Sequence, residues 1–327
     1  MTVLLLLALA AEPVPADGDR QTILFLGDSI TFAGGYVDHF DAQLRLAAAH
    51  AGRDAPNVIQ IGLSSETVCG MTEQGHPFPR PNVHSRLKSA LERIEPDVVF
   101  ACYGMNDGIY KPLDAERFAC YQDGMRRLVR DVLASAAELV LLTPPPFDRT
   151  GRRIGRKPMV TAEQQAAGAI GIYEGYDEVL TKYAAFVASL PDEEEFREQP
   201  LSVIDLHAYL KRNLAGARKF NKAFTYAKDG IHPDQQGHRI MGLWISQLRG
   251  GAEPLKLADP RTKRAMTLIR ERSTMLRDAW HAAIGHEHPR KPPGLPVERA
   301  EAKAAELDRQ IAAIMADIAN REPAAAF

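Results

Sequence analysis

Five short apolar runs constrain the fold of this chain more than any other feature of its sequence. Each is rich in aliphatic and β-branched residues, as buried strands are. Longer stretches with helical patterning separate them, and this alternation predicts repeated βαβ units with right-handed crossovers. The sequence therefore predicts a parallel sheet that helices cover on both faces. The runs lie at residues 22–26, 58–61, 98–102, 139–143 and 201–206, and the helical stretches at 37–49, 83–94, 114–136 and 173–190.

Composition indicates an ordinary globular protein. The chain has 327 residues, of which 45% are hydrophobic, enough for one large domain with an accessory piece. Forty basic residues oppose 42 acidic ones, so no strong field favours nucleic acid or an anionic membrane surface, and we expect no nucleic-acid partner. The three cysteines, Cys69, Cys102 and Cys120, include no CxxC pair. They predict neither a disulfide framework nor a metal site.

Residues 1–16 resemble a secretory signal peptide. The apolar stretch 3–11 precedes small residues that offer cleavage after Ala10 or Ala16, and it is too short to span a bilayer. No basic residue lies in its first positions, which departs from the usual pattern. We expect a secreted or periplasmic protein with no stable membrane insertion.

The character of the sequence changes near residues 250–254, where a Gly-Gly-Ala-Glu-Pro segment predicts a boundary. The region 255–322 carries two apolar stripes at helical spacing, separated by a proline-rich break at 286–294. It therefore predicts a C-terminal helical hairpin. The stripes favour packing against the main body, although a dimer contact is the alternative, and the sequence leaves the oligomeric state open.

Three of the predicted strands end in residues that suit ester chemistry. Ser29 follows the first strand in Gly27-Asp28-Ser29-Ile30, Gly62 follows the second, and Asn106 follows the third. The Gly-Asp-Ser turn alone indicates a helix cap more often than a nucleophile. With strand order 2-1-3-4-5, however, Ser29 lies at the topological switch point between Gly62 and Asn106. The Ser29 and Gly62 N–H groups and the Asn106 amide could then stabilise an oxyanion.

A candidate base lies far downstream, in Asp229-Gly230-Ile231-His232-Pro233. A carboxylate three residues before an imidazole can accept from one ring nitrogen while the other faces a serine hydroxyl. Taken alone, Asp-x-x-His is more often a polar turn.

These blocks together resemble the SGNH hydrolases, also called GDSL-type esterases, over residues 20–250. The resemblance implies a flavodoxin-like three-layer α/β/α sandwich with a five-stranded parallel sheet of order 2-1-3-4-5. It also implies Ser29 as nucleophile, His232 as base, Asp229 as its orienting carboxylate, and an oxyanion hole of Ser29, Gly62 and Asn106. One departure is Gln60, which stands where the family often has asparagine; we expect it to leave the Gly62 donor intact.

The resemblance implies hydrolysis of a carboxylic ester through an acyl-enzyme, without a cofactor or metal. O-deacetylation of a carbohydrate or another small polar ester is the leading expectation. A lipase, lysophospholipase or thioesterase of the same superfamily is the first alternative, and a non-catalytic glycan-binding protein on this fold is the second. Two loops after strand ends, 64–82 and 144–172, are expected to shape the pocket for a small-molecule or polysaccharide ester. The candidate substrate-binding residues in them are Glu66, His76, Arg80 and Arg152.

Overall fold

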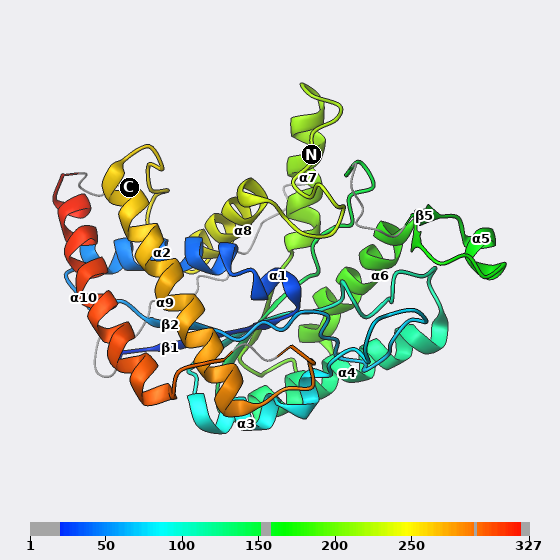
Figure 1. Ribbon diagram of the computed structural model, residues 1–327, viewed down its shortest axis with the longest axis horizontal. Coiled ribbons are helices and arrows are strands. Elements are labelled where there is room, and N and C mark those ends of the chain that lie inside the picture. The colour runs from blue at the N-terminus through cyan, green and yellow to red at the C-terminus, as the bar shows by residue number, and fades with distance from the viewer. Residues whose placement is uncertain (1–19, 152–157, 291–292, 322–327) are drawn as a thin grey trace.

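A five-stranded parallel sheet runs through the centre of the computed structural model, which describes residues 20–151, 158–290 and 293–321 (Figure 1). Its order is β2-β1-β3-β4-β7, and every neighbouring pair is parallel. Because β7 is the fifth strand of this sheet along the chain, the predicted order 2-1-3-4-5 is confirmed. The strands are β1 (Thr22–Gly27), β2 (Asn57–Gln60), β3 (Val98–Cys102), β4 (Glu138–Leu142) and β7 (Leu201–Ile204).

The middle of the sheet is apolar on both faces, as a parallel sheet between helices requires. Phe25 of β1 stacks on Phe100 of β3 with ring centroids 4.6 Å apart, and the ring of Phe40 packs edge-on against both. The two strands end in register, with Gly27 opposite Cys102. The segments that carry Ser29 and Asn106 therefore leave a rigid platform side by side.

Helices form a layer on each side of the sheet. Figure 1 shows α2 and α8 above it and α3 and α4 below it. The fifth predicted strand is shorter than expected because Asp205 caps α7, a helix that the sequence analysis did not predict, by accepting from Ala208 N–H. The helices of the main body are α1 (Ser29–Phe32), α2 (Gly35–His50), α3 (Leu87–Ile94), α4 (Ala115–Leu133), α6 (Tyr176–Ser189), α7 (Leu206–Arg218) and α8 (Gln235–Gln247).

The long loop after β4 contains structure of its own. Two short parallel strands, β5 (Met159–Val160) and β6 (Ile172–Tyr173), pair there and enclose α5 (Ala162–Ala166). The small sheet is attached to the main body by a hydrogen bond from Tyr173 N–H to Tyr110 O. It thus lies against the loop that follows β3.

The predicted C-terminal hairpin is confirmed as a pair of helices, α9 (Pro260–Ile284) and α10 (Val297–Arg321). They pack on each other and on α2, and α9 also lies against the edge strand β2 (Figure 1). Arg272 of α9 is buried there and donates to Val58 O. The apolar stripes are buried within their own chain, as we expected, through residues such as Leu268, Leu276, Leu307, Ile311 and Ile318.

No helix in the described part of the chain is long and apolar enough to cross a membrane. The predicted signal peptide at 1–16 lies outside the described residues.

Candidate active site

Ser29 occupies the first position of α1, directly after β1. Asp28 is the N-cap of this short helix, and its Oδ1 accepts a hydrogen bond from Ile30 N–H at 2.9 Å. The Ser29 N–H is the first of the helix and lies outside its internal hydrogen-bond pattern. The turn therefore presents both the hydroxyl and a backbone donor at the carboxyl edge of the sheet.

Ser29, His232 and Asp229 form a hydrogen-bonded chain. Ser29 Oγ is 2.9 Å from His232 Nε2, and His232 Nδ1 is 2.6 Å from Asp229 Oδ2. Since a carboxylate only accepts, the proton lies on Nδ1, and Nε2 is left to accept from the serine hydroxyl. Asp229 Oδ1 also accepts from the N–H groups of Ile231 and His232, which fixes the carboxylate relative to the imidazole.

His232 and Asp229 stabilise each other's charged forms. Burial lowers the pKa of His232, but the hydrogen bond and charge of Asp229, together with the charge of Asp28, outweigh it, and the pKa lies above its usual value. Burial raises the pKa of Asp229, but the bonds from His232 and Ile231 outweigh that and leave it below its usual value. The pair therefore favours the imidazolium that forms when His232 takes the serine proton.

The Asp229–His232 turn is held from behind by Asp148, which lies beyond the end of β4. Its carboxylate accepts from Arg218 Nη2 and from Thr225 Oγ1, each at 2.6 Å, and its N–H donates to Gly230 O at 2.9 Å. Burial raises the pKa of Asp148, but these bonds outweigh it and leave the pKa below its usual value. Asp148 is therefore a positioning residue that the sequence analysis missed.

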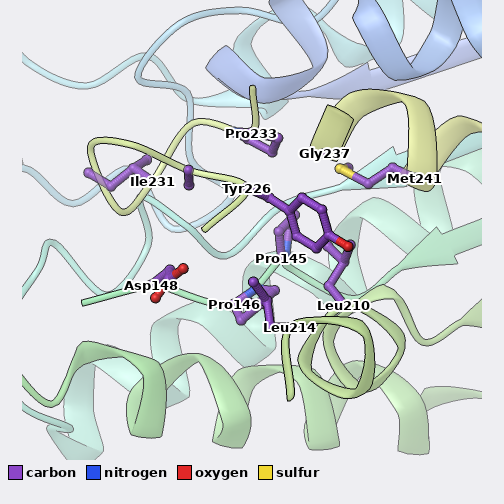
Figure 2. Close-up of a pocket in the computed structure, with 11 residues that line it drawn as sticks. Pro145, Pro146, Asp148, Leu210, Leu214, Tyr226, Ile231, Pro233, Gly237 and Met241 are labelled. Carbon is purple, nitrogen blue, oxygen red and sulfur yellow. The ribbon is translucent and has the colours of Figure 1, made fainter. Parts of the chain in front are cut away.

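A small cavity separates this turn from α7 and α8. Figure 2 shows Tyr226, Ile231 and Pro233 lining it together with Pro145 and Leu210. Its volume of about 20 Å³ is room for roughly one water molecule. The back of the turn is thus closely packed, which restrains the imidazole.

Gly62 lies against the backbone of α1, and only a glycine fits there. A Cβ at this position would collide with Phe32 N and Thr31 C. We expected Gln60 to leave the N–H of Gly62 free as a donor. Its side chain instead binds that donor, because Gln60 Oε1 accepts from Gly62 N–H at 3.1 Å. Gln60 is buried, so its amide folds back on its own strand end. The Gly62 N–H is close to the site, but an oxyanion has to share it with Gln60.

Asn106 is held by both ends of its amide. Its Nδ2 donates to Glu66 O at 3.1 Å, and its Oδ1 accepts from Tyr110 Oη at 3.0 Å. An amide nitrogen carries two protons, so one remains for an oxyanion. Ile109 and Tyr110 both have positive φ angles, of 44° and 56°, which marks the loop after β3 as strained. Tyr110, which the sequence analysis did not single out, thereby orients Asn106.

The predicted substrate contacts of Glu66 and Arg80 do not agree with their placement. Glu66 has no exposed surface and binds Arg86 through two hydrogen bonds of 2.6 Å. Arg80 is buried in a two-bond pair with Glu73, and its guanidinium lies 5.6 Å from the centre of the Tyr110 ring. Each charge is paired with an opposite charge inside the protein, because a buried ion requires a partner. Glu66 and Arg80 therefore stabilise the protein structure around the site.

His76 and Arg152 are the other two predicted substrate-binding residues. His76 is half-buried in the loop after β2, where its Nδ1 bonds to Phe78 O and its ring packs edge-on against that of Phe78. Arg152 lies outside the described residues, as does most of the arginine-rich segment 149–157.

A pocket of about 520 Å³ lies on the β2 side of the sheet edge, and Phe32 of α1, the helix that begins with Ser29, lines it. It lies between α1, the residues after Gly62, and the connection of α9 to α10. The histidine-rich break between the two apolar stripes was the available sequence signal for this part of the site. The lining residues are Phe32, Leu63, Ser64, His281, His286, His288 and Arg290.

Several solved structures are similar to this one at low sequence identity. The structure is similar to that of a gut microbial diltiazem-metabolizing enzyme, at 16% identity and a TM-score of 0.50, over 74% of this chain but only about half, 49%, of that enzyme. An acetyl xylan esterase matches at 16% identity and a TM-score of 0.49, over 69% of this chain and 98% of its own.

A catalytic mutant of an acetylxylan esterase from Geobacillus stearothermophilus matches at 20% identity and a TM-score of 0.47, over 73% and 98% of the two chains. At such identities the likeness concerns the fold alone. No curated relative matches the sequence. The model of the GDSL-like lipase/acylhydrolase family matches residues 25–240, which is well over half of the chain. The protein therefore belongs to the GDSL-like lipase/acylhydrolase family, whose members are hydrolases of carboxylic esters.

Proposed function

We propose that the protein is a serine esterase that hydrolyses small polar esters through an acyl-enzyme on Ser29. The observation that carries this proposal is the chain of hydrogen bonds from Ser29 Oγ through His232 to Asp229. Each group is within bonding distance of the next, and the proton on Nδ1 leaves Nε2 ready to act as a base.

The mechanism has two steps. Ser29 Oγ attacks the ester carbonyl carbon while His232 Nε2 takes the hydroxyl proton, and the oxyanion receives hydrogen bonds from Asn106 Nδ2 and the Ser29 N–H. His232 then returns the proton to the departing alcohol oxygen, which leaves the acyl group on Ser29. Water then attacks that acyl group while His232 Nε2 takes one of its protons. The bond from the acyl carbon to Ser29 Oγ breaks as His232 returns this proton to Oγ, and the acid is released. Asp229 keeps the imidazole oriented and stabilises its charged form throughout.

Carbohydrate O-deacetylation is the substrate reaction we propose. The neighbouring pocket combines apolar Leu63 and Phe32 with hydroxyl, imidazole and guanidinium groups. Such a mixed lining suits a hydroxylated molecule, which can form hydrogen bonds with its polar groups. A long alkyl chain would leave those polar groups without partners, so it fits the pocket less well.

Replacing Ser29 tests the proposal. Ser29→Ala is expected to abolish ester turnover and labelling by a fluorophosphonate probe, with an unchanged unfolding temperature. Wild-type enzyme assayed with 4-nitrophenyl esters of increasing chain length should prefer acetate, and it should release acetate from acetylated polysaccharides. Full turnover by Ser29→Ala would refute the nucleophile. A maximum at long chains would refute deacetylation but leave the serine esterase intact.

A further inference from the structure

The C-terminal helical pair forms one side of the larger pocket, which Phe32 of α1 also lines. His281, His286, His288 and Arg290 form this side, which we call the hairpin wall. His281 lies in the last turn of α9, and the other three follow it in the connection to α10. A segment more than 200 residues from Ser29 in sequence thus borders its site.

The hairpin wall is attached to the segments that carry the catalytic groups. Arg277 of α9 donates to Phe32 O at 2.8 Å, and its guanidinium lies 4.0 Å from the centre of the Phe32 ring. His281 donates from Nε2 to Ile61 O at 3.2 Å, one residue before Gly62. Burial lowers the pKa of His281 to about 3, so this imidazole is neutral and keeps a single proton for that bond. Helix α9 therefore holds both α1 and the end of β2.

The connection is fixed on its other side by the loop after β2. Asn82 N–H donates to Glu287 Oε2 at 3.0 Å, and the rings of Phe78 and His288 meet edge to face at 4.7 Å. His288 Nδ1 lies 3.0 Å from Arg290 N and 3.2 Å from Arg290 O, so backbone contacts within the connection hold its ring. The hairpin wall is thus a built surface, which contacts on both sides hold in place.

We propose that the hairpin wall binds the alcohol part of the ester, as the side of a pocket for one or two sugar rings. A sugar ring has apolar C–H faces and a rim of hydroxyls. Leu63 and Phe32 offer apolar contact, while the imidazole of His288, the guanidinium of Arg290 and the hydroxyl of Ser64 offer polar partners for the rim. No group of three or more metal-ligating side chains in the described ranges could hold a metal ion.

Size assigns the pocket to the alcohol and not to the acyl group. This step rests on the proposed function, in which the acyl group is acetyl. A pocket of about 520 Å³ falls in the range that encloses a drug-sized ligand. An acetyl group would leave most of it empty, whereas the alcohol of an acetylated saccharide would fill it.

The test compares two acetate esters that differ only in their alcohol. 6-O-Acetylcellobiose carries two sugar rings with free hydroxyls, and ethyl acetate has an alcohol too small to reach the hairpin wall. The ratio of their kcat/KM values is measured by acetate release. Arg290→Ala should lower this ratio about 3- to 10-fold, the contribution of one hydrogen bond. Ser64→Phe, which fills the pocket, should lower it further.

Arg264→Ala is the matched control, because Arg264 is an exposed arginine of α9 that does not line the pocket. It should leave the ratio unchanged. An unchanged ratio in both Arg290→Ala and Ser64→Phe would overturn the assignment. So would an Arg290→Ala effect that differs between the acetate and octanoate esters of one alcohol, because the pocket would then take the acyl chain. Activity that survives Ser29→Ala would instead refute the proposed function.

Discussion

The loop after β2 and the connection between α9 and α10 border the same side of the site, yet they use polar residues in opposite ways. In the loop, Glu66 and Arg80 are buried in ion pairs that leave nothing for a ligand. In the connection, His288 and Arg290 line a pocket. A charged residue near a catalytic strand end is therefore no sign of substrate contact until its partner is known, because burial makes a partner obligatory.

The largest expected effect follows from the buried pair of Glu66 and Arg86. Glu66→Gln removes the carboxylate charge and leaves Arg86 buried beside a neutral amide, which should cost about 3–5 kcal/mol of unfolding free energy. Arg290→Ala, at an exposed position, should change it by less than about 0.5 kcal/mol. Urea unfolding of the two variants measures both. If Glu66→Gln were as stable as wild type but bound substrate more weakly, Glu66 would belong to the pocket after all.

Apolar runs and helical patterns were enough to predict the parallel sheet and the hairpin, because each depends on residues within one segment. The order of the strands came from the resemblance to the SGNH hydrolases. The positions of Ser29 and Asn106 at one edge followed from the ends of parallel strands, and the place of His232 followed from the resemblance. Contacts between loops were not predictable in this way. The partners of Arg80 and Asn106 lie in loops without periodicity, and their contacts depend on packing that no local pattern encodes.

Glutamine at position 60 shows the same limit at short range. Gln60 and Gly62 are two residues apart, yet the sequence could not show that the longer amide bends back onto the Gly62 N–H. The consequence is a larger role for the amide of Asn106, because one of the expected oxyanion donors is shared.

The loop after β3 should therefore affect turnover through Asn106 and not through binding. Tyr110→Phe removes the hydrogen bond to Asn106 Oδ1 and should lower kcat about 3- to 10-fold with little change in KM. Asn106→Ala should cost on the order of 10²–10³ in kcat. If Tyr110 acts by orienting Asn106, adding Tyr110→Phe to Asn106→Ala should have no further effect. Full additivity of the two changes would instead indicate an independent role for Tyr110.

The smallest expected effect is a displacement of the pH profile, and it separates the two kinds of imidazole. His232 must be neutral to act as a base. Because Asp229 holds its pKa above the usual imidazole value, the acidic limb of kcat/KM should have its midpoint above pH 6.5. Activity is lost as the pH falls through that value. Asp229→Asn should move the midpoint to lower pH while also slowing the reaction, since the charge that favours the imidazolium is gone.

His281, with a pKa lowered to about 3, is neutral across this range, so His281→Gln should leave the midpoint in place whatever it does to the rate. A midpoint that moved with His281 and not with Asp229 would mean that the hairpin, and not the Asp229–His232 pair, sets the base of the reaction.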